Sequence, residues 1–145
     1  MLLEEAKIYT DGGSRGNPGS SASAYVICKM DETVVEKSGT YIGMATNNQA
    51  EYFGFLRGLE RARDLGINKI HLFSDSQLVV NQMNGVYKIK NQELLPIYQD
   101  TKAVADGFER ITFNYVPREL NKTADAEVNR ILDENERHKK HHHHR

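Results

Sequence analysis

The sequence has little of what marks a secreted, membrane-bound or disulfide-stabilised protein. It contains a single cysteine, Cys28, so no internal disulfide can form. A lone cysteine inside an apolar run is most simply a buried small side chain. No apolar run approaches the roughly 20 residues that a membrane-spanning helix needs. The first five residues have neither the basic start nor the apolar stretch of a signal peptide. We therefore expect a cytosolic protein that makes no contact with a membrane.

An excess of charge of one sign is also absent. Nineteen Lys and Arg stand against 20 Asp and Glu, giving a formal net charge of −1. An anionic partner must therefore be attracted locally or through metal ions, because the overall field does not favour it. The remaining composition is ordinary: 39% of the 145 residues are hydrophobic and 27% are charged. These values predict one globular domain, large enough to bury a core.

The C-terminal end has a different composition from the rest of the chain. Residues 138–145 are His-Lys-Lys followed by four histidines and an arginine. Consecutive histidines can bind a transition metal, but such a run usually derives from a purification tag, and the neighbouring basic residues keep it solvated. We therefore expect one domain over residues 1–137 and a disordered or tag-derived basic tail over 138–145.

Apolar periodicity predicts an α/β domain. A helix that crosses from the third strand to the fourth should place the fourth strand beside the first and parallel to it, because such crossovers are right-handed. The run of strand-like and helix-like segments is not the strict alternation of a doubly wound nucleotide-binding fold. The expected strands cover residues 7–10, 21–30, 33–42, 69–74 and 110–116, and the expected helices cover 49–65, 77–83, 93–108 and 123–136.

Four carboxylates lie directly after predicted strands or near the starts of predicted helices. Asp11 follows the first strand and precedes glycines that we expect to form a turn, and Asp75 follows the fourth strand. Neighbouring parallel strands end at the same edge of a sheet, so these two side chains should meet there. Glu51 and Asp125 lie in the first turns of two helices. Each acid alone also fits an ordinary role in a turn or at a helix terminus.

Four converging carboxylates would repel one another and raise the pKa of at least one member. Two divalent cations would remove this repulsion. Oxygen ligands without nearby Cys or His favour Mg²⁺ or Mn²⁺ over Zn²⁺.

Four short motifs together resemble type 1 ribonuclease H, in the short form that lacks a basic protrusion. The motifs are YTDGGSRGNPG at residues 9–19, TNNQAE at 46–51, SDSQ at 74–77 and NKTAD at 121–125. With the segments between them they cover the chain up to about Glu136. The resemblance implies a mixed five-stranded sheet flanked by helices, with the first three strands antiparallel and the fourth and fifth parallel to the first.

The resemblance also implies an activity. Asp11, Glu51, Asp75 and Asp125 match the family's catalytic carboxylates, which hold two Mg²⁺ ions, for which Mn²⁺ can substitute, about 4 Å apart. One ion would activate water for attack on a phosphorus of the RNA strand of an RNA–DNA hybrid, and the other would stabilise the departing 3′ oxygen. The products would carry 5′-phosphate and 3′-hydroxyl ends. We expect the enzyme to act as a monomer.

Six further positions match family residues that contact the substrate. Amides suit a ribose 2′-hydroxyl because they donate and accept at once. Asn17, Asn48 and Gln77 match contacts to the RNA strand or to neighbouring bases, Asn47 and the Ser14 backbone lie beside them, and Thr46 matches a contact to a DNA-strand phosphate. Two of these residues also have purely structural explanations, because Asn47 could cap a helix and Asn17 with Pro18 could shape a turn.

The chain departs from the family in two places. It has no Trp, and residues 85–91 pass directly to the next helix, so only Lys88 and Lys90 remain where many members have a basic protrusion. The loop before Asp125 has no histidine. Arg118 is a candidate replacement as a phosphate-binding cation, and Glu119 is an alternative that could sit near the ions. Double-stranded RNA stays open as a second substrate.

Two other functions fit parts of the sequence. A non-catalytic nucleic-acid-binding module could use the same fold, although clustered acids would weaken a phosphate-binding surface that holds no metal. The glycines of residues 12–16 could also form a nucleotide-phosphate loop. The segment after them is strand-like and a GxGxxG pattern is absent, so this interpretation has little support.

Overall fold

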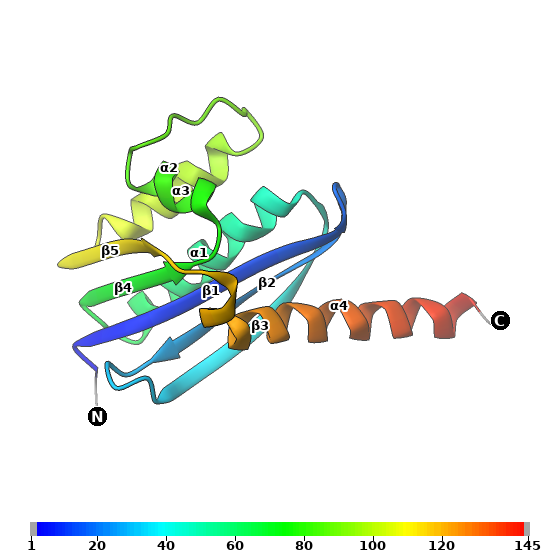
Figure 1. Cartoon of the computed structure of the whole chain (residues 1–145), viewed down its shortest axis with the longest axis horizontal. Helices are drawn as coiled ribbons and strands as arrows, with labels where there is room; N and C mark the ends of the chain where they lie inside the picture. The colour runs from blue at the N-terminus through cyan, green and yellow to red at the C-terminus, as the bar shows by residue number, and fades with distance from the viewer. Residues whose placement is uncertain (1–2, 144–145) are drawn as a thin grey trace.

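Five strands form one mixed sheet in the order β3-β2-β1-β4-β5 (Figure 1). The computed structural model describes residues 3–143. Its strands are β1 (Glu5–Gly16), β2 (Gly19–Cys28), β3 (Val34–Ala45), β4 (Lys69–Ser74) and β5 (Arg110–Tyr115). β1, β2 and β3 pair antiparallel, whereas β4 pairs parallel with β1 and β5 pairs parallel with β4. This topology confirms the predicted fold class, including the fourth strand beside the first.

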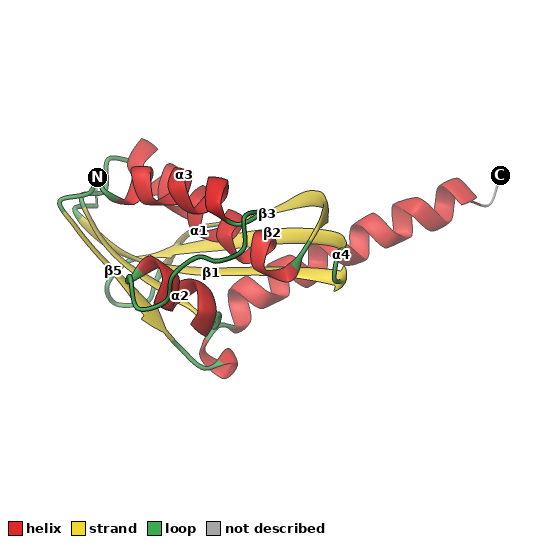
Figure 2. Ribbon diagram, turned by 90° about the horizontal axis from the view of Figure 1, so that it is seen from above, coloured by secondary structure: helices red, strands yellow, loops and turns green. Residues whose placement is uncertain are grey.

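Helices cover both faces of the sheet (Figure 2). They are α1 (Asn47–Asp64), α2 (Gln77–Met83), α3 (Leu95–Ala105) and α4 (Lys122–His143), with a 3₁₀ turn, η1 (Arg118–Leu120), before α4. α1 packs on β1 and β2 and against α3, while α4 crosses the other face over β1, β2 and β3. The main core lies under α1, where Tyr52, Phe55 and Leu59 are fully buried against Ile8 and Leu72. None of the helices over residues 3–143 is both long enough and apolar enough to cross a membrane.

β1 is longer than predicted, and this corrects the expected position of Asp11. Its pairing with β4 stops at Thr10 opposite Ser74, but its pairing with β2 continues from Asp11 to Gly16. Asp11 therefore lies in the middle of β1, one residue beyond the point where β4 ends. The expected turn at Gly12 is wrong, because that residue is part of the hairpin strand and the chain reverses only after Gly16.

The observed ends of α1 and α3 differ in part from the predicted ends. Thr46 caps α1: its Oγ1 accepts a hydrogen bond from the Gln49 amide at 3.2 Å, and the Gln49 side chain accepts one from the Thr46 amide at 2.9 Å. Asn47 is therefore not the cap. α3 is shorter than predicted at both ends, since it begins only after Leu94, with Pro96 in its first turn.

α4 continues to His143, beyond the expected end near Glu136. No Gly or Pro interrupts this stretch. The helix runs past the sheet (Figure 1), and Lys139 Nζ donates to Ser20 Oγ of the β1–β2 hairpin at 3.2 Å. The part of the predicted disordered tail that lies within residues 138–143 is therefore helical, while 144 and 145 fall outside the described residues. Cys28 is free and buried, as predicted.

Candidate active site

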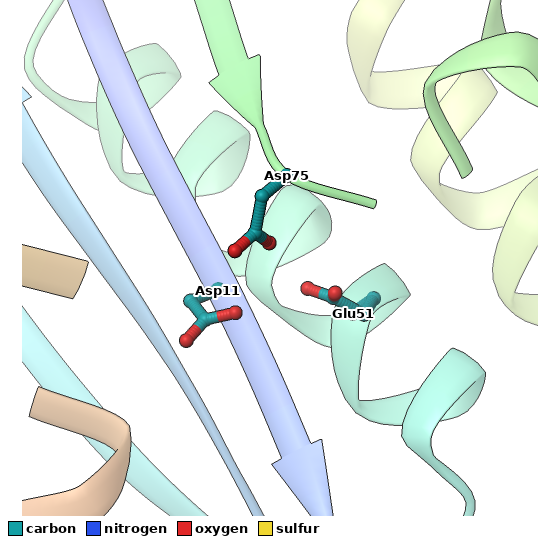
Figure 3. Close-up of side chains that lie close together, drawn as sticks. All are labelled: Asp11, Glu51 and Asp75. Carbon is teal, nitrogen blue, oxygen red and sulfur yellow. The ribbon is translucent and has the colours of Figure 1, made fainter. Parts of the chain in front are cut away.

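Three carboxylates from three elements converge beside β1 (Figure 3). Asp11 comes from β1, Glu51 from the second turn of α1, and Asp75 from the residue directly after β4. Each offers one oxygen, and these oxygens all lie within 4.8 Å of one another. The convergence follows from the register, because β4 stops at Ser74 beside Thr10 and so presents Asp75 next to Asp11. The sequence prediction that these three acids meet is confirmed.

Two glycines allow Glu51 to reach β1. A Cβ on Gly12 would overlap the backbone of Ala50 and Glu51, and a Cβ on Gly54 would lie 2.8 Å from the Asp11 carbonyl oxygen. Neither glycine has a positive φ. Both are therefore needed for the close approach of α1 to β1, and neither serves a turn. This approach places the Glu51 side chain over the strand that carries Asp11.

The fourth predicted carboxylate, Asp125, approaches Asp11 from the other helical layer. It lies in the first turn of α4 and is outside the group of three oxygens. Its charge and a hydrogen bond to Asp11 nevertheless raise the pKa of the Asp11 carboxyl. The Arg118 guanidinium lies 3.6 Å from Asp125 Oδ1, and Asn129 Nδ2 donates to Asp125 Oδ2 at 3.4 Å. Asp11 thus lies between Glu51 and Asp75 on one side and Asp125 on the other.

The site resists ionisation in the absence of cations. Burial, with the charges of Asp75 and Asp125, raises the pKa of Asp11 to about 8. Burial and the neighbouring Asp11 raise the pKa of Glu51 well above its ordinary value. Burial also raises the pKa of Asp75, against the opposing effect of Arg118. Desolvated acids of like charge cannot all be anionic near neutral pH unless cations join them.

The acids also fit a cation by their bonding. Glu51 Oε1 is buried and has no hydrogen-bond partner among the described residues. A buried polar atom without a partner is costly and points to a ligand that is not part of the chain. Hard oxygen donors from several carboxylates are the set that Mg²⁺ and Mn²⁺ prefer. The residues present therefore fit a divalent metal centre.

An open groove of about 450 Å³ extends from the acids along β1. Between α1 and α4 it exposes both hydrogen-bonding and apolar surface. Its lining consists of the four carboxylates, Gly12, Gly13, Ser14, Arg15, Asn47, Tyr115, Arg118, Val128, Asn129 and Leu132. Sequence reasoning missed Arg15, Tyr115 and Asn129, because each enters the groove through pairing or packing that no local pattern reveals.

Three of the predicted substrate residues form one hydrogen-bonded link between the β1–β2 hairpin and α1. The Ser14 amide donates to Asn47 Oδ1 at 2.9 Å, and the Asn47 amide donates to Asn17 Oδ1 at 3.0 Å. Ser14 Oγ also donates to the carbonyls of Ala45, at 3.0 Å, and Gly16. The link fixes the hairpin against the start of α1, on the same side of β1 as the groove.

The remaining predicted substrate residues lie outside the lining of the groove. Asn48 is half-buried in the first turn of α1, and Gln77 is exposed at the start of α2, two residues after Asp75. Over the described chain, neither lines the groove, and neither do Asn17 and Thr46. Of the two alternatives before α4, Arg118 lines the groove and pairs with an acid, whereas Glu119 is exposed outside it.

Comparison with known proteins identifies the family. The sequence profile described as reverse transcriptase-like matches residues 9–131. The chain belongs to the reverse transcriptase-like family. One relative is the ribonuclease HI of Halobacterium salinarum, which is 40% identical over 126 residues. The matched region covers 87% of the chain and 63% of this relative. Another is a bifunctional protein of Mycobacterium tuberculosis, 44% identical over 127 residues. The chain spans only 35% of that relative's length.

Solved structures agree with the sequence relatives. The crystal structure of the H. salinarum ribonuclease H1 superimposes with a TM-score of 0.87 at 39% identity. The match covers 90% of this chain and 98% of the H. salinarum chain. The N-terminal ribonuclease H domain of an M. tuberculosis protein gives 0.86 at 43% identity, with 89% and 94% covered. A ribonuclease H1 solved with an RNA/DNA hybrid gives 0.86 at 36% identity, with 90% and 98% covered. These matches confirm the resemblance to ribonuclease H.

Proposed function

We propose that this domain is an endonuclease that hydrolyses the RNA strand of RNA–DNA hybrids with the help of divalent cations. The observation that carries the proposal is the convergence of Asp11, Glu51 and Asp75, with Asp125 against Asp11. The names of the H. salinarum relative and of the structure solved with a hybrid support the substrate class. Clustered acids alone would repel a nucleic acid, so their presence in the groove favours catalysis over simple binding.

Two sets of residues would hold the cations. Asp11, Glu51 and Asp75 offer one set of oxygens, and Asp11 with Asp125 offers another. We propose Mg²⁺, with Mn²⁺ as a substitute, because all the donors are carboxylate oxygens. When bound, such ions neutralise the phosphate, lower the pKa of bound water and stabilise a leaving oxygen. Asp11 belongs to both sets and lies on a rigid strand, so it should be the least replaceable acid.

Other side chains would bind and orient the nucleic acid. Arg118 is largely exposed beside Asp125 in the groove, which supports its assignment to a phosphate of the bound strand. We assign Asn48 and Gln77 to recognition of the RNA strand and its 2′-hydroxyls, and Thr46 to a phosphate of the DNA strand. Ser14, Asn17 and Asn47 would hold the hairpin in position. Whether double-stranded RNA is also cut then depends on how strictly the second strand is recognised.

Cleavage of a 5′-labelled RNA strand, annealed to DNA and incubated with Mg²⁺ or Mn²⁺, tests the proposal. We expect internal cuts with 5′-phosphate and 3′-hydroxyl ends, and loss of cleavage with a chelator or in Asp11→Asn. Asp31→Asn is the matched control, since Asp31 is an exposed loop carboxylate outside the groove. Undiminished cleavage in chelator or in Asp11→Asn would refute the proposal. Binding without cleavage in both metals would instead identify a non-catalytic module.

The same assay resolves substrate choice. Hybrid, double-stranded RNA and a DNA duplex with one embedded ribonucleotide can be compared side by side at equal concentration. If Arg118 binds a phosphate, Arg118→Ala should slow cleavage of each, and Arg118→Lys should restore part of the rate because it keeps the charge. An unchanged rate in Arg118→Ala would remove this residue from the mechanism.

A further inference from the structure

Asp125 is held differently from the other three acids. It projects from α4, and its side chain is 31% exposed, so the fold encloses it less than Asp11. Besides Asp11, which shares a hydrogen bond with it, two polar neighbours contact its two oxygens separately, Arg118 at Oδ1 and Asn129 at Oδ2. Arg118 is itself 76% exposed and free to turn toward a phosphate. Of these two neighbours, Asn129, one helical turn further along α4, is therefore the one that stays beside Asp125 when Arg118 turns away.

The second partner of the Asn129 amide favours one of its two orientations. Its Oδ1 accepts a hydrogen bond from Arg15 Nη2 at 3.5 Å, while its Nδ2 donates to Asp125 at 3.4 Å. A guanidinium can only donate and an ionised carboxylate can only accept. A flipped amide would present its oxygen to Asp125 and its NH₂ group to Arg15, and both contacts would become unfavourable. Arg15 therefore favours the orientation in which Asn129 offers its NH₂ group to the acid.

Arg15 is in turn well anchored. Its guanidinium pairs with Asp133 and with Glu136, each at 2.8 Å, on the two turns of α4 that follow Asn129. These pairs join the β1–β2 hairpin to α4. They also hold the guanidinium in the plane from which it reaches Asn129. Arg15, Asn129 and Asp125 line the same groove.

We propose that Asn129, oriented by Arg15, is a positioning residue for Asp125 and for the cation site that Asp125 shares with Asp11. This inference rests on the proposed metal-dependent function. The amide donor is neutral, so it directs one oxygen of Asp125 without competing for the cation as a positive side chain would. Outer hydrogen bonds of this kind orient metal ligands and are commonly needed for full affinity.

Cation titration by calorimetry, without nucleic acid, tests the proposal independently of cleavage. Asn129→Leu removes both hydrogen bonds and keeps a side chain of similar branching, and Asn129→Ala removes both hydrogen bonds without adding bulk or charge. Both should weaken Mn²⁺ binding by about 10-fold or more at the site that Asp125→Asn removes. The matched control is Asn135→Leu, the same substitution on the same helix outside the groove. It should bind Mn²⁺ as wild type does.

A double-mutant cycle separates positioning from a general structural effect. If Asn129 acts through Asp125, Asn129→Leu should have no further effect on Mn²⁺ binding in the Asp125→Asn background. In the cleavage assay we expect Asn129→Leu to lower kcat more than it raises KM, with partial recovery at high Mn²⁺. Arg15→Lys keeps the charge toward Asp133 and Glu136 and should retain most of the binding, whereas Arg15→Gln should not.

Two results would overturn the proposal. One is wild-type Mn²⁺ binding in both Asn129 variants, and the other is an equal loss with and without the Asp125 carboxylate. Thermal unfolding of each variant shows whether a loss is only a loss of fold. If wild-type protein binds Mn²⁺ but cuts no hybrid, the nuclease proposal fails while weakened binding in the Asn129 variants still supports positioning.

Discussion

Replacing Asp11 with Asn should stabilise the metal-free protein at alkaline pH. Burial, together with the charges of Asp75 and Asp125, raises the pKa of Asp11 from 3.8 to about 8. A pKa that is higher in the folded than in the unfolded chain gives stability that is complete below about pH 4 and is lost as pH rises through 8. At about 1.4 kcal/mol per pKa unit, the loss has an upper limit of about 6 kcal/mol. Since the groove is open and water screens its charges, we expect about 2–4 kcal/mol.

Urea unfolding at pH 4.5 and pH 8, in chelator, measures this effect. Wild type should lose stability between the two values, and Asp11→Asn should lose much less, so that the variant is the more stable protein only at pH 8. Saturating Mg²⁺ at pH 8 should reverse the order, because only the wild type gains the full free energy of ion binding. Asp31→Asn serves as the control for loss of one exposed carboxylate. Equal stability of Asp11→Asn and wild type at pH 8 would refute the electrostatic reasoning.

Three further predictions concern packing and capping, each measured by urea unfolding. Gly12→Ala should lower the free energy of unfolding by about 3 kcal/mol or more, because its Cβ would overlap the Ala50 backbone. Gly13→Ala should lower it far less, because a Cβ there meets only ordinary contact at 3.4 Å. Similar losses in the two variants would contradict the close approach of α1 to β1. Thr46→Ala should cost about 1 kcal/mol and Thr46→Ser little, since serine keeps the cap; no loss in Thr46→Ala would rule out a stabilising capping box. Asn135→Leu should be neutral or stabilising by about 1 kcal/mol, since Asn135 Nδ2 is buried without a partner in the described part of the chain, and a clear loss would reveal a hydrogen bond through water.

The parts of the fold that the sequence predicts well are those set by local periodicity and chain connectivity. β4 alternates buried and half-buried residues over its whole length, and the helix before it leaves a position beside β1 for a parallel strand. Asp75 could therefore be placed near Asp11 without coordinates. Glu51 could be assigned only to the start of a helix, because its reach depends on a glycine contact between two elements.

The parts that the sequence does not predict depend on contacts between distant residues. Gly12 and Gly13 have no side chains to show the alternation of a strand, so they resemble a turn until β2 is seen beside them. Arg15 and Asn129 are 114 positions apart, and although Arg15 lies in the first motif, Asn129 lies in none, so the sequence does not indicate that the two side chains meet. The helical end of α4 has no stop signal, and its contact with the hairpin exists only in the folded chain.

The charge of the molecule makes cation binding and substrate binding interdependent. With a net charge of −1, the chain has no overall attraction for a polyanion, and its groove contains four carboxylates. Near the acids Arg118 offers one exposed cation, and Lys88 and Lys90 are exposed on the loop after α2. A phosphate entering the groove therefore gains most when cations already neutralise the acids, and a bound phosphate must increase the affinity for cations by the same factor. Hybrid binding should consequently strengthen with divalent ion at fixed ionic strength and weaken steeply with monovalent salt.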